Sequence, residues 1–269
     1  MTARTNGILL LLLLLLSFHA DAVPLPGVDE MKRLVAEPPV EIEVIEPLLI
    51  EGKRQPHVVY LGYPVDKVLR AILGDQWKTA AAEIEFRALD GYVSHIPTER
   101  FDQYRAYLVF AKKHSRTFNV KSRAPDAKSI SLGPYYLVWD NIRQPDLIEE
   151  GATYWPYQVN EIVISRAPEK NPISGDQSRP ARELEKYCLS CHRVNGYGGN
   201  KSPLDLAEQT KILGEKKFYA WVLKPFSIKP DTQMPAMVEG MPEPDREVLA
   251  GRLFHYLNAL PRKQADERP

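Results

Sequence analysis

The sequence predicts a multidomain protein in which a mostly β domain of the α+β class precedes an all-α domain. Three observations lead to this prediction. Apolar and polar residues alternate, as in half-buried strands, between residues 40 and 165. Residues 166–180 are polar and contain proline and glycine, which is the composition of a linker. Apolar residues then recur at helical spacing over residues 181–262, ahead of a short polar tail at 263–269.

Residues 1–22 have the features of a signal peptide. Arg4 supplies the positive charge, residues 8–16 are an unbroken apolar run, and Ala20-Asp21-Ala22 is a small-x-small cleavage pattern. The run is shorter than the ~20 residues that span a bilayer, although an uncleaved anchor remains an alternative. We therefore expect a periplasmic protein that starts near Val23, with no membrane span in the mature chain.

The elements of the first domain follow from local pattern. Residues 23–39 contain four prolines and little periodicity, which predicts an extended arm. Alternation from Val40 predicts a strand, and an apolar stripe over 65–73 predicts a helix that ends at Gly74. The Asp90-Gly91 turn signal predicts a hairpin over 83–96. Further strands are expected at 104–111, 135–139 and 159–164.

The second domain begins and ends with predicted helices. The first starts at Pro180 and keeps one apolar face through Cys188 and Cys191. The last carries a clearer stripe over 249–260, and Pro261 ends it.

The chemical signal of the chain is Cys188-Leu189-Ser190-Cys191-His192, the C-x-x-C-H pattern of covalent haem attachment. Two thiols three residues apart can reach the two vinyl groups along one porphyrin edge, and the next imidazole projects toward the iron. A redox-active C-x-x-C would favour a βαβ context, and a zinc site would need more Cys or His ligands. A lone disulfide is the default for two cysteines in a secreted chain, but the adjacent histidine favours haem.

Residues 181–262 resemble class I cytochrome c. The features that match are the glycines after the motif, a proline loop, a tryptophan in the middle helix, a Met-Pro loop and a Tyr-Leu pair in the last helix: Asn195-Gly196, Gly198-Gly199, Pro203-Leu204, Trp221, Met234-Pro235 and Tyr256-Leu257. The resemblance implies one haem c attached through Cys188 and Cys191. It also implies iron ligation by His192 and Met234.

The resemblance further implies that Pro203, Trp221 and Tyr256 pack around the haem. Some alternatives stay open. Met237 and Met241 also lie near the expected sixth ligand, and Met241 also precedes a proline. Methionine commonly serves as adaptable core filling, and the two aromatic residues are equally compatible with ordinary core positions.

The first domain resembles the sulfite-oxidase-type molybdopterin-binding fold through Leu89-Asp90-Gly91-Tyr92 and a later Gly133-Pro134 followed by a strand. Members of that family that bind molybdenum use a cysteine ligand. Both cysteines of this chain belong to the haem motif, so we expect a cofactor-free docking domain over 40–165. The histidines at 57, 95 and 114 are too widely spaced to predict a metal site.

These features predict a monohaem cytochrome that carries single electrons between periplasmic redox proteins. Methionine as the sixth ligand occupies the remaining axial position and raises the potential, which suits electron transfer better than catalysis. The alternative is a haem-containing oxidoreductase, or its haem subunit, whose first domain binds a pterin or a small substrate. The chain has 35 basic and 35 acidic side chains, so no overall charge favours nucleic acid as a partner.

Overall fold

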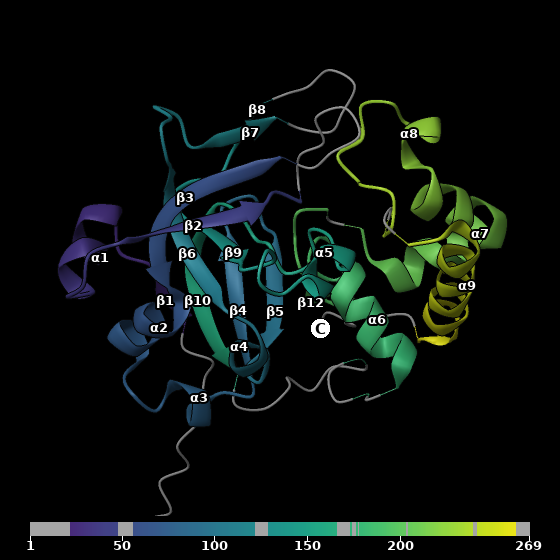
Figure 1. The fold of residues 1–269 in the computed structure, drawn as a ribbon. Helices are drawn as coiled ribbons and strands as arrows, with labels where there is room; N and C mark the ends of the chain where they lie inside the picture. Colours follow the sequence, from purple (N-terminus) through teal and green to yellow (C-terminus); the bar gives the residue numbers. More distant parts are fainter. Residues whose placement is uncertain are drawn as a thin grey trace, which may run out of the picture.

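The computed structural model describes residues 22–47, 56–121, 129–165, 173, 176, 178–202, 204–238 and 241–261. The predicted signal peptide (except residue 22), most of the linker, Pro203 and the tail at 263–269 lie outside these residues. The structure is of the mixed α+β kind, with a β-rich N-terminal part and packed C-terminal helices, which stand on opposite sides of Figure 1. No helix of the described residues is both long and apolar enough to cross a membrane.

Two antiparallel four-stranded sheets form the N-terminal part. One has the order β2 (Val40–Ile45), β3 (His57–Pro64), β6 (Ala106–Lys112) and β9 (Tyr136–Trp139). The other has the order β1 (Ala22–Pro24), β10 (Val159–Ser165), β4 (Glu83–Ala88) and β5 (Val93–Pro97). Both sheets contribute to a single apolar core, in which Tyr60, Phe86, Trp139 and Ile162 are fully buried. A small hairpin, β7 (Asn119–Lys121) with β8 (Ser129–Ser131), lies beside them.

Several local predictions for this part are confirmed. Helix α2 (Val65–Leu73) ends at Gly74, whose φ of 84° is in the left-handed region that glycine adopts easily. Strands β4 and β5 pair across the predicted turn, with Ile84 opposite Ile96. The remaining short helices are α3 (Trp77–Ala80), α4 (Arg100–Gln103) and α5 (Asp146–Glu149).

The predicted extended arm over residues 23–39 is wrong. Val23 lies in β1 opposite Ile162, and helix α1 (Val28–Leu34) follows it. Met31 is fully buried and Val35 is 4% exposed, so this segment is part of the core. Its prolines stand on either side of the helix and leave one short apolar stripe between them, at a spacing of three and four residues.

Among the described residues, the C-terminal part has four helices: α6 (Arg179–Tyr187), α7 (Leu206–Leu223), α8 (Pro225–Ile228) and α9 (Glu243–Ala259). Their buried residues form a second core, separate from the first, that includes Leu184, Phe218 and Leu253. Helix α7 is interrupted at Gly214, whose φ is 69°. The expected all-α domain also contains one two-residue hairpin, β11 (Arg193–Val194) with β12 (Tyr197–Gly198), because the glycine-rich segment after the motif turns back on itself.

Helix α9 packs against both α6 and α7. The guanidinium of Arg252 on α9 donates to both carboxylate oxygens of Glu183 on α6, at 3.0 and 2.7 Å. Two described residues of the predicted linker also belong to this part, because Ile173 is buried in the second core and Asp176 accepts a hydrogen bond from Tyr256. The linker is therefore anchored at these two points.

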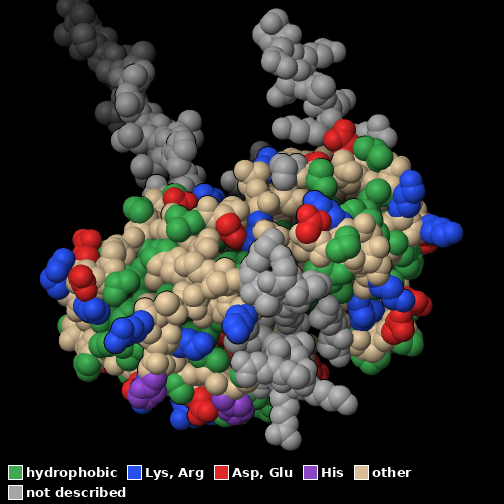
Figure 2. Space-filling model, turned by 90° about the horizontal axis from the view of Figure 1, so that it is seen from above, with side chains coloured by type: hydrophobic (Ala, Val, Ile, Leu, Met, Phe, Trp, Pro, Cys, Tyr) green, Lys and Arg blue, Asp and Glu red, His purple; other side chains and the backbone are tan. Residues whose placement is uncertain are grey.

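Charged side chains of both signs are interspersed on the face shown in Figure 2. This distribution agrees with the balanced formal charge of the whole chain.

Candidate functional site

The C-x-x-C-H motif lies in a tight turn at the end of α6. The helix ends at Tyr187, one turn earlier than its apolar face predicts, and Cys188 is its C-cap. The amides of Cys191 and His192 both donate to the Cys188 carbonyl, at 3.2 and 3.0 Å. Both thiols are free and are not within disulfide distance of each other. The turn therefore presents two unpaired thiols and an imidazole within five residues.

Two glycines let the backbone after the motif pack closely against this turn. The Gly199 amide donates to the Leu189 carbonyl at 2.7 Å, and a Cβ added at Gly199 would lie 2.1 Å from the Ser190 carbonyl oxygen. Gly198 has a φ of 113°, and a Cβ there would lie 2.4 Å from the His192 carbonyl oxygen. A larger residue at either position would push the backbone away from the motif, which explains the glycine pair physically.

Both thiols are protonated at neutral pH. Burial raises the pKa of Cys188 to about 12 and that of Cys191 to about 11. Reactive C-x-x-C cysteines show the opposite shift, because a nearby positive charge or a helix N-terminus stabilises their thiolate. The motif lacks the electrostatics of a thiol–disulfide exchange site.

The imidazole of His192 is neutral and incompletely hydrogen-bonded. Burial lowers the pKa of His192, and the nearby backbone of Leu204 opposes that shift more weakly. The Nδ1 atom is buried and has no hydrogen-bond partner of good geometry among the described residues. A neutral imidazole is the form that binds metal, and a metal-binding histidine normally uses one nitrogen for the metal and donates with the other. Thiols and imidazole therefore fit the residues that a covalently attached haem requires.

The three candidate methionines differ in burial. Met237 is 8% exposed within the second core, and its amide donates to the Val222 carbonyl at 2.8 Å. Met234 and Met241 are only partly buried at the edge of the same core. Met237 is therefore enclosed by the core, whereas the thioethers of the other two are less enclosed.

The remaining predicted haem neighbours are placed as follows. Tyr256 packs against the second core, as Cys188 does, and its hydroxyl donates to Asp176 Oδ2 at 2.7 Å. Trp221 on α7 is half-buried and is not among the residues packed against that core. Pro203 lies outside the described residues. The structure thus gives Tyr256 a role in anchoring the linker that its sequence context did not reveal.

The Asp-Gly-Tyr turn of the first domain docks directly on the motif. The Val93 amide donates to the Ser190 carbonyl at 2.9 Å, and the Asn200 amide donates to the Gly91 carbonyl at 2.8 Å. A Cβ added at Gly91 would come within 3.0 Å of the backbone at Asn200, and its φ is 85°. Burial raises the pKa of Tyr92, which lies close to Cys191. One domain therefore covers the motif of the other.

Lys201 connects the same two parts by charge. Its ammonium donates to Asp90 Oδ2 at 2.6 Å and to the Tyr157 hydroxyl at 2.8 Å, and it lies 4.9 Å from the centre of the Tyr157 ring. Burial acts to lower the pKa of Lys201, but Tyr157 and Asp90 raise it overall. Sequence inspection missed this contact because its members are far apart along the chain.

A cleft of about 440 Å³ lies beside the docked turn. Both domains line it, with Arg87, Tyr92 and His95 on one side and Tyr197 and Asn200 on the other. Its volume is in the range of small-molecule sites.

No protein-family model matches the sequence, and no curated protein is significantly similar to it. The proposed function therefore rests on the chemistry of the chain's own residues.

Proposed function

We propose that this chain is a periplasmic monohaem c-type cytochrome that transfers single electrons between redox proteins. The observation that supports the proposal best is the turn at 188–192, with two free protonated thiols and a neutral imidazole whose Nδ1 has no partner of good geometry among the described residues. A redox-active dithiol and a zinc site fit less well. The thiol pKa values are raised, and the described residues provide no further ligand group around the motif.

Each residue of the site has a defined task in this proposal. Cys188 and Cys191 would hold the haem through thioether bonds, and His192 and Met234 would be the ligands of its iron. Bound in this way, haem c supplies one-electron chemistry between Fe(II) and Fe(III). The glycine pair fixes the backbone of the motif, and the turn at 89–92 shields it from one side.

The proposal also assigns each of the two domains to a fold. The contact of α6 with α9, tied by Glu183 and Arg252, supports a class I cytochrome c domain, in which the first and last helices cross. The first domain retains the Asp-Gly-Tyr turn of the sulfite-oxidase-type fold but uses it to contact the motif. We therefore assign it to docking, without a cofactor of its own.

Covalent attachment is tested by producing the chain with the haem-attachment machinery and staining a denaturing gel for haem. The wild-type chain should retain one haem, and Cys191→Ala should lose stable attachment. Ser190→Ala is the matched control, since it changes a motif residue that offers no attachment atom, and it should keep its haem. A denatured Cys191→Ala chain that still carries haem would overturn the proposal.

The sixth ligand is tested by replacing each candidate methionine with leucine, which preserves volume. Met234→Leu should abolish the weak far-red Met–iron absorption band and lower the reduction potential. Met237→Leu and Met241→Leu should leave both unchanged. Loss of the band in either of these two variants alone would move the ligand to that position.

The cleft favours one alternative, a haem-containing oxidoreductase whose substrate binds between the domains. Its lining includes Arg87, which is paired with Glu85 and Glu161, and the polar residues Asn160 and Asn200, which suit a small polar molecule or a pterin. Stoichiometric molybdenum in the purified protein would favour this enzyme over the electron carrier, whereas five-coordinate, high-spin iron would favour an enzyme that acts at an open haem site.

A further inference from the structure

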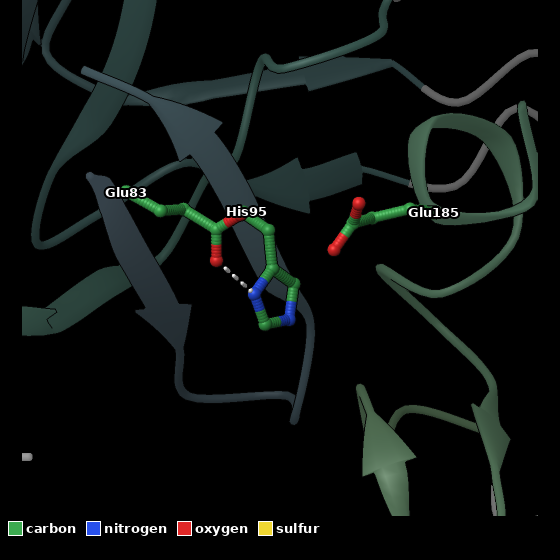
Figure 3. A group of neighbouring side chains, drawn as sticks. All are labelled: Glu83, His95 and Glu185. Atoms are coloured by element: carbon green, nitrogen blue, oxygen red, sulfur yellow. Dashed lines mark hydrogen bonds and ion pairs between the residues drawn. The ribbon is translucent and has the colours of Figure 1, made fainter. Parts of the chain in front are cut away.

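We propose that Glu83, His95 and Glu185 form a binding site for a divalent transition-metal ion where the two domains meet. Glu83 comes from β4, His95 from β5 and Glu185 from α6. One ligand atom of each lies within 4.8 Å of the other two. Figure 3 shows the carboxylates of Glu83 and Glu185 on opposite sides of the His95 imidazole. This site is separate from the haem motif, and the proposal does not depend on the proposed electron transfer.

The strand pairing explains why two of the ligands meet. His95 is the direct partner of Glu85 in the β4–β5 ladder, and Glu83 lies two residues from Glu85 on the same face. The Nδ1 atom of His95 is 2.8 Å from Glu83 Oε1 and 3.9 Å from Glu85 Oε1. Helix α6 then brings Glu185 to this edge of the sheet from the other domain.

His95 is almost fully buried, although one of its two ring nitrogens has no hydrogen-bond partner among the described residues. The residue is 6% exposed, and its Nε2 atom is buried with no hydrogen-bond partner among the described residues. A buried polar atom left without a partner costs about 1–3 kcal/mol in general. The other ring nitrogen, Nδ1, lies 2.8 Å from Glu83 Oε1 and 3.5 Å from the Tyr197 hydroxyl, so Nδ1 is the atom that this ring offers to an ion between the carboxylates.

The carboxylates also lack a fixed counter-charge. Arg87 binds Glu85 and Glu161, at 2.7 and 3.1 Å, and does not contact Glu83 or Glu185. No Lys or Arg pairs with either of these two among the described ion pairs, and Glu185 accepts a hydrogen bond from the neutral Tyr197 hydroxyl at 2.6 Å. With two carboxylates counted as ionised, one proton on His95 leaves the three residues with a net negative charge. Burial raises the pKa of Glu185, so a bound cation would also favour its ionised form. A divalent cation with a neutral imidazole brings them to zero.

The donor set selects the class of ion. Calcium and magnesium prefer six or more oxygen ligands, whereas zinc takes a mixture of imidazole nitrogen and carboxylate oxygen with four ligands in all. Three protein ligands leave one position for water. Zinc bond lengths of about 2.0–2.2 Å put tetrahedral ligand atoms about 3.3–3.6 Å apart. His95 Nδ1 and Glu83 Oε1, at 2.8 Å, would therefore separate slightly, and ligand atoms up to 4.8 Å apart would approach by side-chain rotation.

A metal here would tie the two domains together. Glu185 lies three residues before Cys188, so the ion would join the β4–β5 edge to the helix that carries the motif. Tyr197, whose hydroxyl contacts Glu185 and whose ring lies 5.1 Å from that of His95, belongs to the hairpin after the motif. The ion would therefore fix the motif from both of its ends.

The test is zinc titration calorimetry on the full chain after EDTA treatment, which leaves haem iron in place. Wild-type protein should bind one Zn²⁺ per chain. His95→Gln and Glu185→Gln should each weaken binding by about 100-fold or more, since each removes one of three ligands. His57→Gln is the matched control, because His57 forms a similar pair with Glu43 at 3.0 Å but both side chains are more than half exposed. It should bind zinc like the wild type.

Thermal unfolding of the zinc-free variants shows that each is folded, and added zinc should stabilise only the wild type and the control. Absence of stoichiometric zinc binding in the wild type would overturn the proposal. So would full binding by both His95→Gln and Glu185→Gln, or equal loss in His57→Gln. Haem iron is quantified separately, so the zinc-binding measurement can be interpreted even if the chain does not attach haem.

Zinc affinity should also rise with pH over the range in which His95 loses its proton. Burial acts to lower the pKa of His95, but the Glu83 hydrogen bond and the charges of Glu83, Glu85 and Glu185 raise it overall. The metal must displace that proton, so binding should release protons and its heat should depend on the buffer. Tyr197 also faces the imidazole, but it stays neutral in this range because burial and the nearby carboxylates raise its pKa.

Discussion

Replacing Lys201 by methionine tests whether the first domain is held on the motif by charge. Methionine keeps much of the apolar stem and removes the ammonium, which bridges Asp90 and Tyr157. The side chains of Lys201 and Asp90 are 19% and 27% exposed. The pair therefore lies between surface ion pairs, worth about 0–1 kcal/mol, and buried ones, whose disruption costs about 3–5 kcal/mol.

We expect Lys201→Met to lower the free energy of unfolding by about 2–3 kcal/mol, because Asp90 loses its counter-charge and Tyr157 loses a charged donor. Urea denaturation measures this change as a shift of the midpoint. The matched control is Lys32→Met, since the Lys32–Asp29 pair is 46% and 86% exposed and should be worth less than about 0.5 kcal/mol.

A double-mutant cycle with Asp90→Asn isolates the pair itself. If the two charges interact as their 2.6 Å separation indicates, the effects of the single changes should differ from additivity by about 1–2 kcal/mol. A loss below about 0.5 kcal/mol in Lys201→Met, or strictly additive effects in the cycle, would refute the reasoning.

Two further changes test other parts of the fold. Tyr60→Phe removes a 2.6 Å hydrogen bond to the fully buried Glu46 and should cost about 2 kcal/mol in urea unfolding, whereas Tyr104→Phe, whose bond to Asp146 is 3.4 Å and exposed, should change little. Burial acts to raise the pKa of Glu183, but hydrogen bonds from Arg252 and Arg179 lower it overall. Because the folded-state pKa lies below the unfolded value of about 4.3, its stabilisation is present at neutral pH and is lost as the pH falls through the folded pKa. Glu183→Gln should therefore lower the melting temperature near neutral pH, and the difference from wild type should shrink as the pH falls below the unfolded value of about 4.3; a constant difference would contradict the assignment.

Local chemistry in the sequence was sufficient for several elements. The apolar stripe over 65–73 with Gly74 after it gave α2, and Asp90-Gly91 gave the hairpin of β4 and β5. In both cases the deciding interactions join residues a few positions apart, so a short window contains them. The C-x-x-C-H motif is likewise local, and its chemistry is readable without the fold.

Helix α1 and strand β3 were not predicted from the sequence pattern. The prolines of residues 23–39 concealed the short helix α1, whose stability depends on burying Met31 against the sheets. Strand β3 (His57–Pro64) was not anticipated, because its residues are apolar nearly throughout and show no alternation of apolar and polar types. In the structure its buried and more exposed positions alternate over the first six residues, so the tertiary fold and not the residue pattern sets its two faces.

The sequence by itself supplied the motif on which the proposed chemistry rests, two cysteines and a histidine within five residues, and the order of a β-rich part before a helical one. Only the tertiary structure decided what surrounds the motif. The Asp-Gly-Tyr turn, Lys201 and the Glu83–His95–Glu185 cluster meet across about 100 positions of chain, as His95 and Tyr197 do at a separation of 102 residues. The wide spacing of the histidines predicted no metal site, because that argument considered histidine ligands alone and not the carboxylates of Glu83 and Glu185. The carboxylates that complete the cluster converge through strand pairing and domain docking, and neither leaves a periodic trace in the sequence.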